Sequence, residues 1–441
     1  MSFLRVPDGM TRRHFMTHLA GASAMVVPAM SFTNSVLANA TDLRRRHKSC
    51  IMLWMGGGPA TIDMWDLKPG QPTGGEFRNP ISTSLPGLEI SEHLPLMSKQ
   101  MHNLAVVRSM STKEADHNRG RYYMHTGYVP NPNIEHPSYG SVIAHELAAK
   151  VPELEIPPFV SVGGGSEGPG FLGMTWAPFV VSQNGDVRDL RMGVEQNRLQ
   201  QRMAMLKTTE TSFMMDVSGK DKGSDLRALE FGGPTTPAGD HAKIIEKTLK
   251  LMTSKQMETF KVGTEPKAVQ DRYGQTGFGK GCLMARRLVE LGVPFIEVDL
   301  GGWDTHANNF TTLKNQKLPE LDKAFAALVA DLKERSLLDD TVIVWLGEFG
   351  RTPRINGGAG RDHWARSWSV VVGGGGFKRG TVVGKTNADG TMVDSEPYTS
   401  QDLMASVCKA MGISLDTTFT SNNGRPMKIA NSGKVIKELF A

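Results

Sequence analysis

Charged side chains gather directly after an apolar run near residue 341, where they could bind a metal ion or an anion. The run Thr341–Leu346 (TVIVWL) is rich in β-branched residues, which predicts a strand buried on both faces. Glu348, Arg351 and His363 follow it, in a stretch whose glycines exclude a long helix or strand. Open α/β sheets bind ligands at the carboxyl ends of their strands. We therefore interpret this cluster as a candidate site; a surface ion pair of Glu348 with Arg351 and a packed loop histidine are the alternatives.

Two further apolar runs end in the same way. Residues 50–55 are followed by a glycine turn and then by Asp63, and residues 293–300 are followed by Asp304 and His306. Alternate residues of a D-x-H pattern can face one point, as metal ligands at strand ends do. We expect Asp63 to be a metal ligand as well, although an Asx-turn residue that satisfies its own loop has the same pattern.

A fourth polar segment surrounds a short predicted helix, Asn118–His125, with Gly127 as its C-cap. Asp116 or His117 would lie at the N-terminal end, where backbone N–H groups and the helix dipole favour an anion. With Arg121 and nearby hydroxyls this segment could form a nucleophile or oxyanion region. Serine, aspartate and asparagine also gather at helix starts for capping alone, so that alternative stays open.

These segments need a scaffold of alternating strands and helices. Further strands are predicted at 103–107, 367–372 and 381–383, and further helices at 138–150, 318–332 and 399–411. Such alternation predicts an α/β fold with a mostly parallel sheet covered on both faces. Residues 185–290 are more polar and helical in pattern, which indicates a helical insertion or cap.

Composition limits the class of protein. The chain has 441 residues, 39% hydrophobic and 22% charged, as in ordinary globular proteins. Its net charge of +5 is small for this length, and no basic run is interleaved with aromatic residues, so we expect no nucleic-acid partner. The three cysteines lie far apart without ligand spacing, which favours buried free thiols. A disulfide between two of them stays open for an exported protein.

The N-terminus has the pattern of an export signal. Arg12 and Arg13 follow Thr11 and precede an apolar stretch, as in twin-arginine signals, and residues 38–40 form an A-x-A cleavage site. We therefore assign residues 1–40 to a signal peptide and 41–441 to the folded domain, with the twin-arginine translocase as a partner. The mature protein would be periplasmic or extracellular. No later stretch is apolar enough to span a membrane, and an amphipathic N-terminal helix is the alternative for residues 1–40.

Taken together, the motifs resemble a known family. The likeness is carried by LWMGGGPATIDMWDLKPG, ADHNRGRYYMHTG, GGWDTHANNF, GEFGRTP, GRDHW and VVGGGGFKRGTVVGKTNADG, which span nearly all of the mature chain. They are similar to those of uncharacterised, twin-arginine-exported bacterial proteins of the alkaline phosphatase superfamily, often labelled sulfatase-like. The resemblance implies a largely parallel central sheet flanked by helices, and two metal sites at the strand ends.

The resemblance also implies roles for individual residues. The implied metal ligands are Asp63, Asp304, His306, Glu348 and His363. Phe349 stands where the family has a histidine, and His117 stands at the nucleophile position, with Arg121 retained. We expect His117 to ligate a metal in compensation for Phe349, and to stay neutral beside the helix N-terminus. A base, a direct nucleophile and a helix cap are its alternative roles.

Two functions fit these expectations. The first is an exported hydrolase of phosphate or sulfate esters, on a small molecule or a glycan, that uses a divalent cation (Zn, Mn, Ca or Mg). In this hypothesis Arg121 and Arg351 clamp the oxyanion. The second is a binding or surface protein that keeps the scaffold without turnover.

The signal pattern makes a direct prediction. Cleavage after the A-x-A site at residues 38–40 should leave Thr41 as the first residue of the mature protein. N-terminal sequencing of exported protein measures this. Exported protein that still carries Met1 or the arginine pair would contradict it.

Overall fold

The run Thr341–Leu346 forms strand β8 in the computed structural model, with the bounds expected from the sequence. The structure describes residues 47–187, 195, 197–199, 201–205, 208 and 248–440. The fold described below is that of the unit Lys48–Ala441. The expected signal peptide, residues 1–40, lies outside the described residues.

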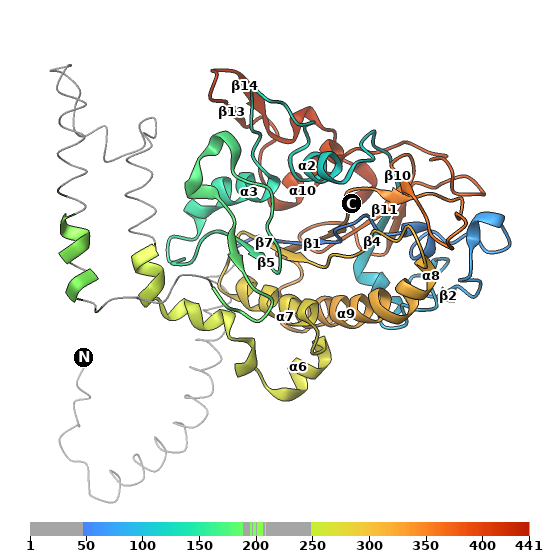
Figure 1. Cartoon of the computed structure of the whole chain (residues 1–441), viewed down its shortest axis with the longest axis horizontal. Helices are drawn as coiled ribbons and strands as arrows, with labels where there is room; N and C mark the ends of the chain where they lie inside the picture. Colours follow the sequence, from blue (N-terminus) through green and yellow to red (C-terminus); the bar gives the residue numbers. More distant parts are fainter. Residues whose placement is uncertain are drawn as a thin grey trace, which may run out of the picture. The chain divides into compact units, whose positions relative to one another are not determined.

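Strand β8 lies inside an eight-stranded sheet of order β12-β4-β11-β8-β1-β7-β5-β6 (Figure 1). The strands are β12 (Thr381–Val383), β4 (Leu104–Met110), β11 (Trp368–Gly373), β8, β1 (Ser49–Trp54), β7 (Phe295–Asp299), β5 (Phe159–Val162) and β6 (Phe179–Val181). Neighbours pair in parallel except at β11, which is antiparallel to both β8 and β4. The predicted α/β fold with a largely parallel central sheet is confirmed.

Helices cover both faces of this sheet (Figure 1). On β1, Ile51 and Leu53 belong to one hydrophobic core, and Met52 and Trp54 belong to a second core on the opposite face. The first core contains residues of α7 (Gly277–Glu290) and α9 (Leu318–Glu334), and the second contains residues of α3 (Tyr139–Leu147) and α10 (Ser400–Met411). Burial on both faces explains why β1 and β8 read as continuous apolar runs.

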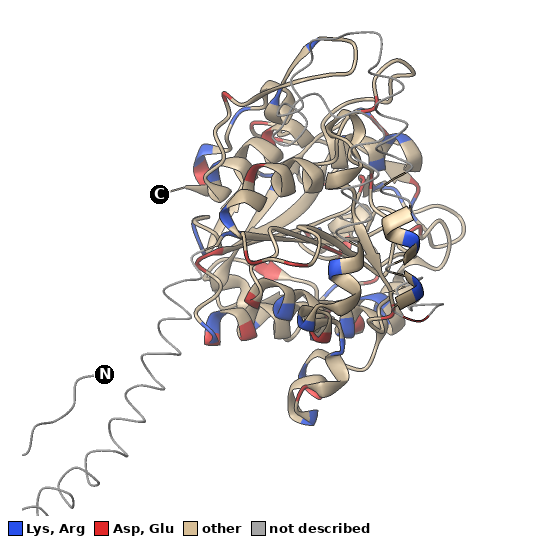
Figure 2. Cartoon of the chain, turned by 90° about the vertical axis from the view of Figure 1, so that its left-hand side faces the viewer, with Lys and Arg blue, Asp and Glu red and all other residues tan. Residues whose placement is uncertain are grey.

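The described part of the chain also has shorter elements. They include the helices α2 (His117–Thr126), α6 (Lys267–Tyr273) and α8 (Asn309–Thr312), and three two-stranded ribbons: β2 (Ile81–Ser82) with β3 (Glu89–Ile90), β9 (Gly350–Arg351) with β10 (His363–Trp364), and β13 (Thr418–Thr420) with β14 (Pro426–Lys428). Acidic and basic residues are interspersed over the described chain in Figure 2, in keeping with the small net charge. No described helix has the length and apolarity that a membrane crossing requires.

The range 185–290, expected to form an insertion or cap, contains part of the main helical layer. Helix α7 contributes to the core under the sheet, beside α9. At Gly281 an added Cβ would lie 2.8 Å from Val298 Cγ1, so glycine lets α7 approach β7 closely. The end of the range therefore belongs to the sheet's own covering layer, while most of residues 188–247 lies outside the described chain.

The three cysteines, Cys50, Cys282 and Cys408, are free and buried, as expected. Burial raises the pKa of each thiol, which keeps it protonated. These residues act as small apolar side chains in the two cores.

Helix α2 is fixed at both ends and along its length. The Asp116 carboxylate accepts a hydrogen bond from the backbone N–H of Arg119, and Gly127, at φ +75°, forms the C-cap in the left-handed region. Farther along, the His125 ring is buried, with Nε2 3.2 Å from Glu297 Oε1 on β7. Glu297 Oε2 accepts a hydrogen bond from Ser166 Oγ at 2.5 Å. This buried pair anchors α2 on the sheet.

The pair of His125 and Glu297 should make stability depend on pH. Burial lowers the pKa of His125, but the charge and hydrogen bonding of Glu297 outweigh it, so this pKa is raised. The pair therefore stabilises the fold fully below the unfolded pKa of about 6.5, and this contribution is lost as the pH rises through the raised folded pKa. Glu297→Gln should cost about 3–5 kcal/mol at pH 6, because it leaves a buried cation unpaired, and much less at pH 9.

Urea denaturation of wild type and Glu297→Gln at the two pH values measures this difference. Ser166→Ala is the control, because it removes a hydrogen bond from Glu297 without changing a charge, and its cost of about 1 kcal/mol should not depend on pH. An equal cost of Glu297→Gln at pH 6 and pH 9 would contradict the prediction, because it would show that the charge of His125 in the folded protein does not change between these pH values.

Candidate metal centre

The loops that follow the carboxyl ends of β4, β7 and β8 carry the expected ligands. His117 begins α2 after β4, Asp304 and His306 follow β7, and Glu348 and His363 follow β8. The ribbon of β9 and β10 places His363 opposite Arg351 in its register. Since β4, β7 and β8 run in the same direction, their loops meet at one edge of the sheet.

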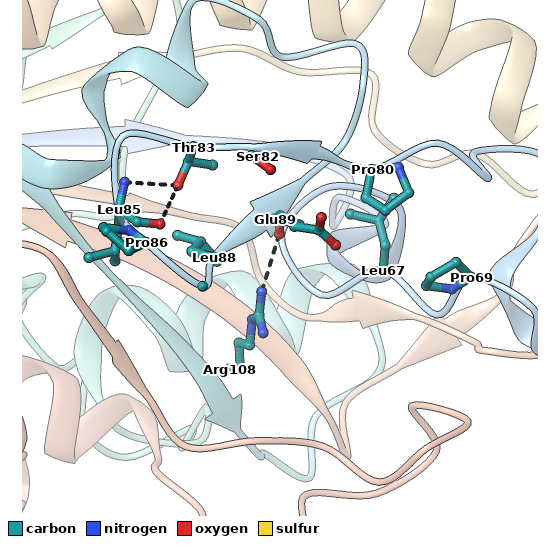
Figure 3. Close-up of a pocket in the computed structure, with 11 residues that line it drawn as sticks. Leu67, Pro69, Pro80, Ser82, Thr83, Leu85, Pro86, Leu88, Glu89 and Arg108 are labelled. Atoms are coloured by element: carbon teal, nitrogen blue, oxygen red, sulfur yellow. Dashed lines mark hydrogen bonds between the residues drawn. The ribbon is translucent and has the colours of Figure 1, made fainter.

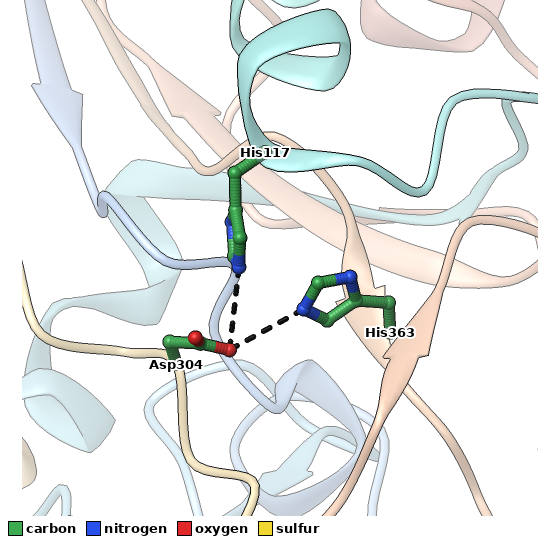
Figure 4. Close-up of side chains that lie close together, drawn as sticks. All are labelled: His117, Asp304 and His363. Atoms are coloured by element: carbon green, nitrogen blue, oxygen red, sulfur yellow. Dashed lines mark hydrogen bonds and ion pairs between the residues drawn. The ribbon is translucent and has the colours of Figure 1, made fainter.

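One carboxylate oxygen, Asp304 Oδ1, is the centre of this cluster. It lies 3.0 Å from His306 Nε2, 3.3 Å from His117 Nε2 and 3.4 Å from His363 Nε2. The nitrogens His306 Nε2 and His363 Nε2 are themselves 3.0 Å apart. The ligand atoms of His117, Asp304 and His363 all lie within 4.8 Å of one another. Figure 4 shows these three side chains pointing toward one another. These three residues are the group that the described chain brings within mutual ligand distance, and His306 adjoins it through Asp304 Oδ1 and His363 Nε2.

The second nitrogen of each imidazole meets a hydrogen-bond acceptor. His117 Nδ1 lies 2.7 Å from Glu348 Oε1, His306 Nδ1 lies 2.8 Å from Asp362 Oδ1, and His363 Nδ1 lies 2.7 Å from the Ala115 carbonyl. These carboxylates and this carbonyl only accept, so each Nδ1 carries the proton. In the neutral ring each Nε2 then presents a lone pair to Asp304. Metal-ligating histidines are held in this way by carboxylates and carbonyls.

Arg351 holds Asp304 in place. Its guanidinium is fully buried and donates to Asp304 Oδ1 at 2.5 Å, to the carbonyls of Gly57 and Gly58, and to that of Arg361. Burial raises the pKa of Asp304, but the hydrogen bond and charge of Arg351 outweigh burial and lower it below its ordinary value. The expectation that Arg351 clamps a substrate oxyanion does not fit this geometry, because the protein itself uses the guanidinium.

Glu348 faces the ring of His117 rather than the centre of the cluster. Its Oε1 accepts hydrogen bonds from His117 Nδ1 and from the backbone N–H of Gly57, while its buried Oε2 has no hydrogen-bond partner. The hydrogen bond to Glu348 raises the pKa of His117, which is opposite to the expectation from the helix dipole. The structure therefore places Glu348 behind a ligand, where it orients the imidazole.

Phe349 packs against the imidazoles from one side. Its ring centroid lies 5.2 Å from that of His117 and 4.7 Å from that of His363. An added Cβ on Gly120 of α2 would lie 3.0 Å from Phe349 Cδ1, so the helix rests closely on this ring. Phe349 thus limits how the two imidazoles can turn.

Asp63 does not join the cluster. Its carboxylate is fully buried and is held by Arg361, whose Nε and Nη2 each lie 2.7 Å from one carboxylate oxygen. Asn309 Nδ2 donates to the same carboxylate at 2.8 Å. Both oxygens are occupied, so we leave Asp63 out of the ligand set that the structure supports.

Arg121 also binds within the protein. Its Nε donates to Glu167 Oε1 at 2.9 Å and its Nη2 donates to the Gly165 carbonyl. Its side chain stays 35% exposed, so these contacts leave it partly open to solvent. The arginine ties α2 to the loop after β5, and the structure gives no contact between it and Asp304.

A glycine turn after β1 allows the loops to come together. Gly57 has a φ of +110°, and an added Cβ would lie 2.5 Å from the backbone nitrogen of Asp304. Only glycine combines this conformation with so close an approach. The loop of Asp304 therefore packs directly on the turn that also binds Arg351 and Glu348.

The structure also has a cavity of about 480 Å³ (Figure 3). Its lining includes Leu67, Leu88, Glu89 and Arg108, and none of the expected site residues. Arg108 at its base donates to the Trp65 carbonyl and pairs with Asp66. The lining of the cavity includes no comparable group of metal-ligand atoms, so we take the imidazole cluster as the candidate site.

From the sequence, no role was assigned to three residues that help to build the candidate metal centre. Asp362 and Ala115 orient ligands, and Arg361 binds Asp63. Arg361 and Asp362 directly precede His363 in the GRDHW motif. Their position beside an expected ligand was the sequence signal that could have indicated a role at the site. The Ala115 carbonyl carries no sequence signal, because every residue has one.

Several solved structures match the chain at low sequence identity. A sulfatase from Pseudoalteromonas sp. is 14% identical, with 86% of this chain and 70% of that chain covered at a TM-score of 0.39. A phosphonate monoester hydrolase from Silicibacter pomeroyi is 12% identical, with 89% of this chain and 77% of that chain covered at a TM-score of 0.33. A protein in the alkaline phosphatase superfamily from Vibrio parahaemolyticus is also 12% identical, with 90% of this chain and 71% of that chain covered at a TM-score of 0.39. All three TM-scores are below 0.5.

The sequence comparison gives the family. No protein of curated function matches the sequence. A family model described as "Protein of unknown function (DUF1501)" matches residues 47–440, almost the whole of the chain after the expected signal peptide. The resemblance to a family of this kind, stated from the motifs, is confirmed. The chain belongs to the DUF1501 family.

Proposed function

We propose that the chain is an exported, metal-dependent hydrolase of phosphate or sulfate esters, with one divalent ion held by His117, Asp304, His306 and His363. The observation that carries this proposal is the convergence of three Nε2 atoms on Asp304 Oδ1 while each Nδ1 binds an acceptor. Export rests on the Arg12–Arg13 pattern, and it places the protein in the periplasm or outside the cell.

The spacing of the donor atoms fits a bound cation. Two ligands that each lie about 2.0–2.1 Å from one ion at a tetrahedral angle are about 3.3 Å apart. The separations of 3.0, 3.3 and 3.4 Å around Asp304 Oδ1 are close to this value. Without a cation or an extra proton, the lone pairs of His306 and His363 would face each other at 3.0 Å. A shared positive charge removes this repulsion.

The donor set also favours particular metals. Three imidazole nitrogens and one carboxylate suit Zn²⁺, and imidazole suits other late transition ions. Ca²⁺ and Mg²⁺ prefer shells made of oxygen. Among the cations expected from the sequence we therefore propose Zn²⁺.

The chain's own residues prepare the site. Arg351 keeps Asp304 ionised and fixes its direction, and Glu348 keeps the Nε2 lone pair of His117 directed at the centre. The side chains of Asp304 and His306 are 46% and 45% exposed, so an ester can reach the cluster from solvent. A bound divalent ion would polarise the ester and lower the pKa of a water molecule.

Water is the nucleophile that this arrangement supports best. Within the described residues, the Thr112 hydroxyl is buried without a hydrogen-bond partner, and Ser111 is held through its backbone N–H to the Tyr398 carbonyl. Neither hydroxyl donates a hydrogen bond to Asp304 or Glu348 in the described structure. We therefore propose hydrolysis without a covalent ester on serine or threonine.

Added metal should stabilise the fold through this site. A ligand that binds only the folded state at 100 times its dissociation constant adds about 2.7 kcal/mol to stability. We expect Zn²⁺ to raise the thermal midpoint of protein treated with a chelator, and Mg²⁺ to have little effect. Calorimetry measures both. Asp304→Ala should lose the response, and an equal response to Zn²⁺ in this variant would place the metal elsewhere.

His117 should be needed for metal binding and for turnover. His117→Ala removes a ligand, so metal affinity should fall by more than the roughly 10–100-fold that loss of a second-shell partner costs. Metal content and hydrolysis of generic phosphate and sulfate esters are measured together. His145→Ala is a matched control, since His145 is 37% exposed against 35% for His117 and also places Nδ1 beside a glutamate.

The outcomes separate the two functions. Unchanged metal stoichiometry together with unchanged turnover in His117→Ala would remove His117 from the site. A wild type that binds the metal with full occupancy and hydrolyses none of the esters would favour the alternative, a binding protein that keeps this scaffold without turnover.

A further inference from the structure

The buried pair of Asp63 and Arg361 lies directly beside the loops that carry the metal ligands. Both side chains are 0% exposed, and the guanidinium binds the carboxylate through two hydrogen bonds of 2.7 Å. Such a bidentate pair has a fixed geometry. A pair in this place can therefore fix the relative positions of the neighbouring loops, in addition to neutralising its own two charges.

Arg361 uses its remaining donors on backbone carbonyls. Nη1 donates to Thr352 and Pro353, and Nη2 donates to Thr73 as well as to Asp63. The guanidinium thereby joins the loop after β8 to the loop after β1. Lysine could not replace it, because one ammonium cannot reach five acceptors in these directions.

The backbone of Arg361 reaches the other ligand loop. Its N–H donates to the Thr305 carbonyl at 3.0 Å, and Thr305 lies between the ligands Asp304 and His306. The Arg361 carbonyl accepts from Arg351, which holds Asp304. Asp362 and His363 follow in sequence, so one residue connects the segments of all three of these ligands.

Asn309 closes the network from the opposite side. Its Nδ2 donates to Asp63 Oδ2 at 2.8 Å, and its Oδ1 accepts from Thr305 Oγ1 at 2.6 Å. Thr305 is therefore held twice, by Arg361 through its carbonyl and by Asn309 through its hydroxyl. This leaves the backbone between Asp304 and His306 little freedom to move.

A buried ion pair adds little net stability over apolar residues of equal volume, because the desolvation of both charges opposes its attraction. We propose that Asp63, Arg361 and Asn309 are positioning residues that hold the loops 304–306 and 361–363 in register, so that the imidazoles of His306 and His363 meet at Asp304. This inference rests on the metal site proposed above. It replaces the role of metal ligand expected for Asp63 with that of a fixed partner for a guanidinium.

The test uses Co²⁺ as the probe, because its visible absorption reports ligand geometry in the full mature protein. Arg361→Lys keeps the charge and loses the bidentate geometry. Its Co²⁺ dissociation constant should rise about 10–100-fold, as for other second-shell changes, and its absorption spectrum should change shape. Asn309→Ala keeps both charges and should also raise the Co²⁺ dissociation constant. This variant provides the test if Arg361→Lys does not fold.

Arg286→Lys is the matched control. Arg286 on α7 is also buried and pairs with Glu290 on the same helix, Asp331 on α9 and Glu265, none of which lies in the ligand loops. Its variant should lose stability and keep the wild-type affinity and spectrum. Wild-type Co²⁺ binding in folded Asn309→Ala and Arg361→Lys would overturn this inference and leave the metal site standing. A wild type that binds no Co²⁺ would instead overturn the metal site itself.

Discussion

Three imidazole nitrogens held within 3.4 Å of one carboxylate oxygen form the contact on which the rest of this site depends. Left to themselves, neutral imidazoles would turn so that an N–H, not a lone pair, meets the carboxylate. Here that turn is opposed, because Glu348, Asp362 and the Ala115 carbonyl each hold the proton on Nδ1. The protein has fixed the ring orientations that a cation needs.

Two buried arginines hold Asp304 and the backbone beside it in place. Arg351 binds Asp304 directly, and Arg361 binds the adjoining backbone through Thr305 while its side chain is neutralised by Asp63. Neither guanidinium is exposed. In both cases the guanidinium is bound by groups of the protein itself and is not free to bind an anion from solvent.

The sheet explains why the ligands come from distant parts of the sequence. Strands β4, β7 and β8 run in the same direction, so their following loops gather at one edge although about 250 residues separate the first ligand from the last. Close packing at Gly57 and Gly120 then brings the β1 turn and helix α2 against these loops. The side chains of Asp304 and His306 remain 46% and 45% exposed, so the cluster is in contact with solvent.

The sequence by itself determined the framework of this protein. Burial on both faces makes β1 and β8 continuous apolar runs, and the three- and four-residue spacing of leucines in α9 marks its buried face, so the elements and the largely parallel sheet were predictable. The order of strands within the sheet was not, because apolar periodicity carries no information about neighbours. Polar residues after strands also pointed to His117, Asp304, His306 and His363.

Only the tertiary structure decided what each polar residue does. Asp63, Glu348 and Arg351 have the residue types of ligands and anion clamps, yet each is occupied by a partner distant in sequence: Arg361, His117 and Asp304 respectively. A carboxylate at a strand end can bind a metal or a guanidinium with similar geometry. Which of the two it meets depends on how loops pack in space, and spacing along the chain does not record that.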